Sequence, residues 1–157
     1  MKRFRIAGFV AVAAVAVAAA AFAAEPIATA FTNWGEVSVE LMSVERKGNV
    51  LTVKWAVRNE GASRQPVFFG FAGEDVCYAV DEESGTKYYV LTDKEGVPLA
   101  SANDWISSGT SGSKYELEPG QVKRHWMKLP APPPEVTAIS LFMHEVEPFE
   151  DVPITDR

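Results

Sequence analysis

The sequence predicts an all-β protein built as a single antiparallel β-sandwich of seven to eight short strands. In several short segments apolar and polar residues alternate, which is the period of a half-buried strand. Clusters rich in Gly, Asn, Asp and Ser separate these segments. Beyond Ala24 the sequence has no long apolar stripe at helical spacing. Together these observations are typical of a sandwich.

The first two predicted strands show the clearest alternation. Every second residue is apolar at 37–41 and again at 51–58, and Trp55 lies on the apolar face of the second segment, so we expect it in the core. Turn signals at 47–49 and 59–61 follow these strands. The remaining predicted strands are 67–71, 76–80, 86–92, 115–117, 122–129 and 136–143.

Two connections differ in kind from the short turns. The segment 107–113 consists of Ser, Gly and Thr, which predicts a flexible polar loop. The segment 130–134 holds four prolines, so it should be stiff and extended. We expect this proline turn to join the last two predicted strands as a hairpin.

The first residues predict a secretory signal peptide at 1–23. Lys2, Arg3 and Arg5 form a basic start, an apolar run follows, and Ala-Phe-Ala at 21–23 fits the A-x-A cleavage pattern. Cleavage there leaves one domain, 24–157, and implies a periplasmic or secreted location. An uncleaved anchor is the alternative, because the apolar run nearly reaches the length that a bilayer requires.

Removal of the leader makes the chain more acidic. The leader holds three of the 15 Lys and Arg residues and none of the 21 Asp and Glu residues, which leaves 12 against 21 and a formal charge of −9. Such a surface repels phosphate backbones and anionic lipid heads. We therefore expect no nucleic-acid partner, and no stable membrane insertion once the leader is cleaved. Because the chain is expected to be exported, its expected partner is an envelope protein.

The segment 78–96 places seven charged residues around two adjacent tyrosines, which raises the hypothesis of a metal-binding loop. A calcium loop of the EF-hand type needs glycine at its sixth position, but counting from Asp81 that position is Thr86. Two glycine-containing turns, 82–85 and 93–96, explain the same residues. We predict two solvated turns with a strand between them, and a cation site is the alternative.

Cys77 is the only cysteine, so no disulfide within the chain is possible. It shares a strand face with Ala79, and an unpaired cysteine of this kind is usually a small buried core residue. A reactive thiol or an intermolecular disulfide is the alternative. No Lys, Arg or His lies nearby in sequence to lower its pKa.

Two histidines beside methionines raise the alternative of a copper site, because imidazole and thioether groups suit this metal. The residues are His125 with Met127, and His144 with Met143. In the expected hairpin His125 lies opposite Ser140, which places His144 roughly 13 Å further along at ~3.3 Å per residue. We therefore predict ordinary strand packing here, with no metal ligand and no cofactor.

Catalytic patterns are missing from the sequence. The chain has no G-x-S-x-G elbow, and His-Glu-Val-Glu-Pro at 144–148 lacks the second histidine of the H-E-x-x-H zinc pattern. We predict that the protein is not an enzyme and has no catalytic residue. A Ser-His-Asp set assembled from distant loops is the alternative that the sequence leaves open.

Trp105 is the candidate binding residue. It lies within polar sequence beside the predicted loop at 107–113. A loop tryptophan either anchors a partner or folds back as a plug over the end of the sandwich. If it is an anchor, Trp105→Ala weakens partner capture more than Tyr89→Ala does. A large loss of melting temperature would instead identify a plug.

Four stretches resemble a known family: "VERKGNVLTVKWAVRNEG", "DEESGTKYYVLTDKEG", "LEPGQ" and "LPAPPPEVTAISLF". They are similar to the telokin-like, immunoglobulin-fold domains of secreted bacterial proteins, including domains that precede OmpA-type peptidoglycan-anchoring modules. The resemblance covers most of 37–154, although the cysteine pair of antibody domains and the corner tyrosine are absent. It implies an immunoglobulin-like sandwich and a non-catalytic exported envelope protein with a binding or scaffolding role.

Overall fold

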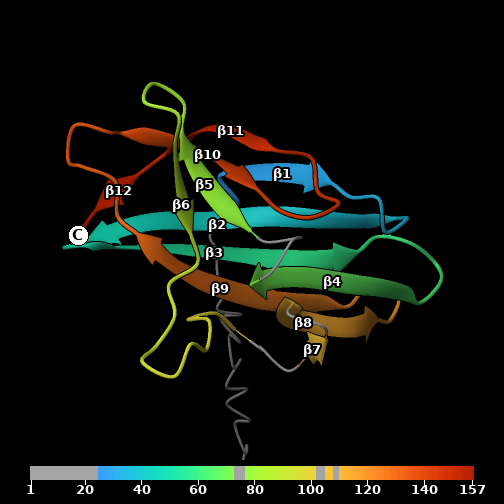
Figure 1. Cartoon of the computed structure of the whole chain (residues 1–157). Helices are drawn as coiled ribbons and strands as arrows, with labels where there is room; N and C mark the ends of the chain where they lie inside the picture. Colours follow the sequence, from blue (N-terminus) through green and yellow to red (C-terminus); the bar gives the residue numbers. More distant parts are fainter. Residues whose placement is uncertain (1–24, 73–76, 102–104, 108–109) are drawn as a thin grey trace, which may run out of the picture.

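A computed structural model describes residues 25–72, 77–101, 105–107 and 110–157 of the chain. All regular structure in these ranges is β-strand, which confirms the predicted all-β class (Figure 1). The strands are β1 (Ala28–Phe31), β2 (Val37–Lys47), β3 (Val50–Asn59), β4 (Gln65–Ala72), β5 (Tyr78–Asp81), β6 (Thr86–Tyr89), β7 (Trp105–Ser107), β8 (Thr110–Leu117), β9 (Val122–Pro130), β10 (Ala138–Phe142), β11 (Phe149–Pro153) and β12 (Thr155–Asp156).

The strands form three sheets. The longest strands make one sheet in the order β1-β2-β3-β9, in which neighbours are antiparallel, and β12 joins it parallel to β2. The other two sheets have the orders β11-β10-β5-β6 and β4-β8-β7. In Figure 1 they lie above and below the middle of the molecule. They meet where the Cys77 N–H donates to the Gly70 carbonyl oxygen over 2.9 Å.

The core lies between the long sheet and the two smaller sheets. Alternation in β3 buries Leu51, Val53 and Trp55 completely, while Lys54 on the opposite face is exposed. From the second layer the ring of Phe69 in β4 meets Trp55 edge-on, with centroids 5.4 Å apart. Large apolar side chains from both layers thus share one core, as the predicted sandwich requires.

The prediction of seven to eight strands is wrong, since the described residues form twelve. The four that the sequence pattern missed, β1, β7, β11 and β12, have two to five residues each. Such short segments hold too few residues to show a period, and β1 even exposes Phe31 on its surface. Pairing with a neighbouring strand, rather than local alternation, defines them.

The expected hairpin between the last two predicted strands is also wrong. β9 pairs with β3, whereas β10 lies between β5 and β11, so the proline segment crosses from one sheet to another. His125 is opposite Trp55 in the register, and Ser140 is opposite Val80. Prolines have no N–H to donate in a tight turn, and the carbonyls of this segment find a donor elsewhere.

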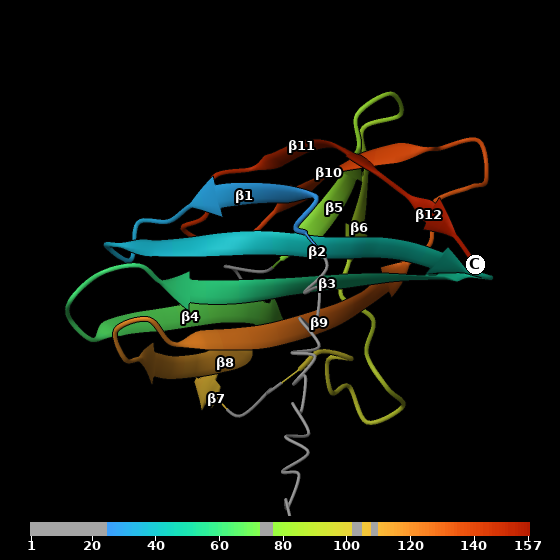
Figure 2. The ribbon, with the colours of Figure 1, turned by 180° about the vertical axis from the view of Figure 1, so that it is seen from behind.

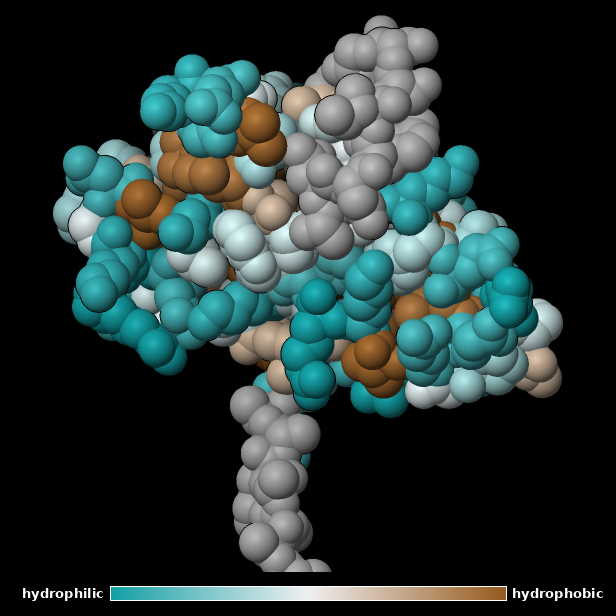
Figure 3. Space-filling view, turned by 90° about the horizontal axis from the view of Figure 1, so that it is seen from below, coloured by the Kyte–Doolittle hydropathy of each residue, from teal (hydrophilic) through white to brown (hydrophobic). Residues whose placement is uncertain are grey.

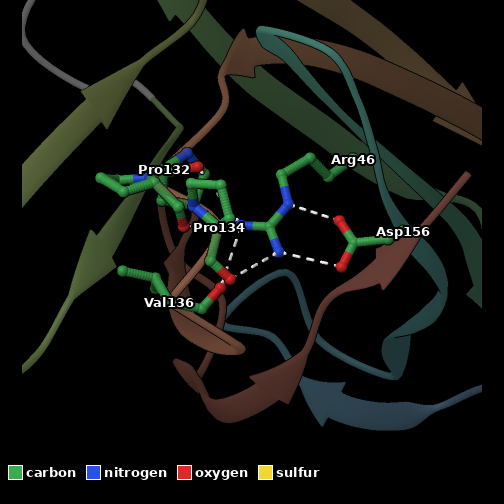
Figure 4. A network of polar contacts seen from close by, with 6 residues as sticks. Arg46, Pro132, Pro134, Val136 and Asp156 are labelled. Carbon is green, nitrogen blue, oxygen red and sulfur yellow. Dashed lines mark hydrogen bonds and ion pairs between the residues drawn. The ribbon is translucent and has the colours of Figure 1, made fainter.

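That donor is Arg46, at the end of β2 (Figure 4). Its side chain is buried, with a relative exposure of 6%, and its Nε and Nη2 donate to the Asp156 carboxylate over 2.5 and 3.0 Å. The same guanidinium also donates to four backbone carbonyl oxygens, those of Pro132, Pro133, Pro134 and Val136, over 2.7–3.3 Å. Arg46 therefore holds both the proline segment and the C-terminal strand β12 against β2.

The surface is mostly hydrophilic. In the view from below, hydrophobic residues gather in patches that hydrophilic residues separate (Figure 3). Among the described residues, the large apolar side chains with the highest exposure are Ile27, Phe31, Tyr89, Val97 and Trp126. Of these, Trp126 lines a groove.

Candidate functional site

The outer face of the long sheet carries a groove of about 660 Å³. Its floor is formed by β2, β3 and β9, which Figure 2 shows side by side from behind. This volume lies within the range of small-ligand sites, roughly 300–1,000 Å³. The lining residues are Met42, Thr52, Lys54, Trp55, Arg124, His125, Trp126 and Lys128.

Strand alternation positions the polar and aromatic side chains of the groove. In β9 the odd-numbered residues from His125 onward are buried, so Arg124, Trp126 and Lys128 stand on the outer face. The register places Lys54 of β3 directly opposite Trp126. The groove therefore combines one exposed aromatic ring with three cationic side chains.

Met42 enters the groove because β2 contains an irregularity. The register between β2 and β3 shifts between Leu41 and Ser43, as at a β-bulge, and Met42 has no partner on β3. An extra residue in a strand bends it and redirects its side chain. The thioether side chain of Met42 thereby adds an apolar, adaptable surface to the β2 side of the groove.

Among the described residues, two of the three cations have no carboxylate partner. Lys54 pairs with Glu45 at 3.4 Å, but within the part of the chain that the structure describes neither Arg124 nor Lys128 makes an ion pair. The Lys128 ammonium lies 6.0 Å from the centroid of the Trp126 ring, at the limit of a cation–π contact. A locally cationic groove on a chain with a net charge of −6 favours an anionic ligand.

A smaller hollow of about 270 Å³ continues the groove along the same face and shares Met42 and Arg124 with it. Here Arg58 is already paired, since it donates to the Glu40 carboxylate over 2.9 and 3.3 Å, and Glu25 adds a second carboxylate to the lining. The pairing raises the pKa of the Arg58 guanidinium, mainly through these hydrogen bonds. The available positive charge therefore lies in the larger groove.

His125 lies on the inner side of β9, and both of its ring nitrogens have hydrogen-bond partners. Nδ1 lies 3.0 Å from Ser101 Oγ and Nε2 lies 2.7 Å from the Tyr115 hydroxyl. The imidazole is also stacked on Trp55, with centroids 5.5 Å apart. Ser101 Oγ in turn accepts from the backbone N–H of Trp126 over 3.0 Å, which fixes the groove tryptophan to this network. A metal ion bound at His125 would have to displace one of these partners.

The second histidine of the copper hypothesis lies in a different sheet region. His144 follows the end of β10 and packs edge-on against Phe68, with centroids 6.1 Å apart. Met143 beside it is buried. Among the described residues, no three His, Cys, Asp or Glu side chains lie close enough together to hold a metal ion. The geometry thus gives the copper alternative no added support.

The acidic segment forms the two predicted turns. The Asp81 carboxylate accepts from the Glu83 N–H over 3.1 Å and from the Ser84 hydroxyl over 2.5 Å, and the hydroxyl bond lowers the pKa of Asp81. In the second turn the Asp93 carboxylate accepts from the Glu95 N–H over 2.8 Å. The glycines that end the turns have φ angles of 68° and 83°, as such turns require. Both turn predictions are confirmed.

Cys77 is a buried core residue, as predicted, with no exposed surface. Burial raises the pKa of its thiol to about 12, although a hydrogen bond from the His144 backbone opposes this shift. A thiol with this pKa is almost fully protonated at neutral pH and is a poor nucleophile. The reactive-thiol alternative therefore finds no support in the fold.

Trp105 does not lie in an irregular loop. Its backbone belongs to β7 and pairs with Gly112 of β8, while its side chain falls outside the described part of the structure. The predicted flexible loop at 107–113 is wrong for the residues that the structure describes, because Ser107 ends β7 and residues 110–113 begin β8, in which 111–113 pair with β4. Backbone pairing across two strands overrides the polar composition of this segment. Residues 108–109 lie outside the description.

Arg124, Trp126 and Lys128 match no sequence motif and were not among the predicted site residues. The alternation of the predicted strand at 122–129 already placed these three residues on one face, opposite His125 and Met127. What the sequence could not indicate is that the Met42 bulge and Lys54 flank that face. The order of the strands in the sheet brings them together.

Comparisons with known proteins found no match to a family model, to a curated protein or to a solved structure. Within the described ranges no helix is long and apolar enough to span a membrane.

Proposed function

We propose that the chain is a non-catalytic exported protein of the cell envelope, with an immunoglobulin-like sandwich as a binding or accessory domain. Export is supported by the basic, apolar and Ala-Phe-Ala pattern of residues 1–23. The two-layer fold, with its antiparallel strands and tight turns, agrees with the architecture that the family resemblance implies.

The observation that carries the proposal is the groove on the outer face of the long sheet. It combines an exposed aromatic ring, Trp126, with the thioether of Met42 and three cations. Tryptophan and arginine are the residues that most often dominate binding energy at interfaces. The groove therefore offers an aromatic ring, a thioether and cationic groups with which a partner can make contacts.

The test is a crosslinking pull-down from the native envelope with the mature chain as bait. Trp126→Ala should reduce capture of the partner by about tenfold or more, in line with the loss of a central aromatic anchor. Tyr89→Ala is the matched control, because Tyr89 is an exposed aromatic residue on β6 in another sheet and should leave capture unchanged. Trp105→Ala in the same assay tests the anchor that the sequence indicated.

Equal capture by wild type and Trp126→Ala would refute the groove as the binding surface. Circular dichroism and thermal melting of each variant show whether the fold is intact. Recovery of the chain from the envelope fraction with a new N-terminus at or near Ala24 would support export, whereas an intact leader would contradict it.

A further inference from the structure

The charged groups of the groove follow the repeat of a β-strand. Arg124, Trp126 and Lys128 are successive outward-facing residues of β9. At ~3.3 Å per residue, the Cα atoms of the two cations are about 13 Å apart, with the tryptophan midway between them. The groove therefore presents the sequence cation, aromatic ring, cation along one straight line.

The neighbouring strands β2 and β3 also contribute side chains to the groove. Met42, at the bulge of β2, also lines the groove and adds a thioether to the surface around the ring. Lys54 stands opposite Trp126, but its ammonium is turned to Glu45 at 3.4 Å. The net unpaired charge thus lies at the two ends, on Arg124 and Lys128.

We propose that the groove binds an extended acidic peptide segment in which two carboxylate residues flank an apolar residue at alternate positions, acid-x-apolar-x-acid. This inference rests on the proposed binding function and names its ligand. An extended chain laid along β9 directs every second side chain toward the sheet, at the same spacing as the strand below it. Its first and last acidic groups then meet Arg124 and Lys128, while the apolar residue lies on Trp126 and Met42.

The charges of the molecule favour a peptide over other anions. Polybasic lipid-binding segments use about four to eight Lys and Arg residues, whereas this groove holds three, one of them already paired. The net charge of −6 opposes a bilayer surface or a nucleic acid, each of which presents many phosphates at once. Two carboxylates at a fixed spacing need only the two local cations.

The experiment measures the binding of a fluorescein-labelled peptide, Gly-Glu-Ser-Leu-Ser-Glu-Gly, to the mature protein by fluorescence anisotropy. We expect saturable binding that weakens as salt rises. Arg124→Gln and Lys128→Gln should each raise Kd by about fivefold, the size expected for a partly exposed charge pair. Trp126→Ala should raise Kd by about tenfold. Lys94→Gln, which removes an exposed charge in the second acidic turn, is the matched control and should not change Kd.

Two further arms test the spacing and the sign of the charges. A peptide of the same composition with adjacent acids, Gly-Glu-Glu-Leu-Ser-Ser-Gly, should bind more weakly, because only one cation is then in reach. The double variant Arg124→Glu/Lys128→Glu should lose the acidic peptide and gain Gly-Lys-Ser-Leu-Ser-Lys-Gly. Circular dichroism confirms that each variant is folded.

Several results would overturn the inference. One is equal affinity for the peptide with spaced acids and the peptide with adjacent acids. Another is an unchanged Kd for Arg124→Gln and Lys128→Gln. A third is binding to phosphatidylglycerol vesicles without binding to the peptide. If peptide binding fails while Trp126→Ala still abolishes capture in the pull-down, the ligand class is wrong and the proposed function stands. If Trp126→Ala affects neither assay, both proposals fail.

Discussion

The substitution Arg46→Met should lower the melting temperature of the protein much more than Asp156→Asn, which changes only the ion-pair partner of Arg46. Methionine keeps an unbranched side chain of comparable length in the buried channel but removes every guanidinium N–H. The four backbone carbonyls of the proline segment and Val136 then lose their donor. Only the bond to the Pro132 carbonyl is fully buried, so water reaches the other three more easily.

The expected loss follows from these contacts. A buried carbonyl left without a donor costs about 1–3 kcal/mol, and three partly buried bonds contribute about 0.5 kcal/mol each. Arg46→Met should therefore lower the free energy of unfolding by about 2.5–4.5 kcal/mol, which corresponds to a fall in Tm of about 10 °C for a chain of this size. Asp156 is 70% exposed, and exposed ion pairs contribute little. Asp156→Asn should shift Tm far less.

The pH dependence of stability separates the contribution of the Arg46–Asp156 ion pair from that of the hydrogen bonds to the carbonyls. The bond from Arg46 lowers the pKa of Asp156 below its unfolded value of about 3.9. The contribution of the carboxylate is then present above that pH and is lost as pH falls through the folded pKa. Below this range Asp156→Asn should match wild type, whereas Arg46→Met should remain less stable because the carbonyls do not titrate.

Urea unfolding of the three proteins at neutral and acid pH, followed by circular dichroism, measures these differences. Equal destabilisation by the two substitutions would refute the reasoning, because it would assign the stability to the ion pair rather than to the carbonyls. An unchanged urea midpoint for Arg46→Met would also refute it.

Two further predictions concern the core. Because burial raises the pKa of Cys77 to about 12, the folded protein should resist iodoacetamide at pH 8 and react once urea unfolds it; rapid alkylation of the folded protein, followed by mass spectrometry, would contradict this. In β8 a Cβ added at Gly112 would lie 1.9 Å from the Phe69 carbonyl oxygen, so Gly112→Ala should cost about 3 kcal/mol in urea unfolding. Gly120→Ala, where φ is 71° but no atom lies within 4 Å, should cost only about 1 kcal/mol. Equal losses would show that the close approach is unimportant.

Local alternation was enough to locate β2, β3 and β9 and their buried faces, but it missed residues 110–113 of β8, which were predicted as a loop. Leu51, Val53 and Trp55 lie on the inner face of β3, as every second residue of a half-buried strand should. The two turns around β6 were equally readable, because glycine and aspartate at fixed positions favour tight turns whatever surrounds them. These features depend on residues within a few positions of one another.

Only part of the candidate groove could be predicted from the sequence. Alternation alone places Arg124, Trp126 and Lys128 on one face, but it does not say whether that face is covered by another layer. Nor does it bring Lys54 and Met42 beside them, since strand order and a bulge decide both. The sequence therefore shows which side chains share one face of β9, but not which side chains of β2 and β3 lie next to them.

The composition and patterning of the chain thus determined an all-β fold with an acidic surface, a buried cysteine and a predicted leader. Tertiary structure alone decided that β9 pairs with β3 and not with β10, that the short edge strands form, and that Arg46 holds the proline segment. The physical reason is that side-chain alternation is a local property. Backbone hydrogen bonding between strands is satisfied by any partner in reach, so the packing of the whole chain selects the partner.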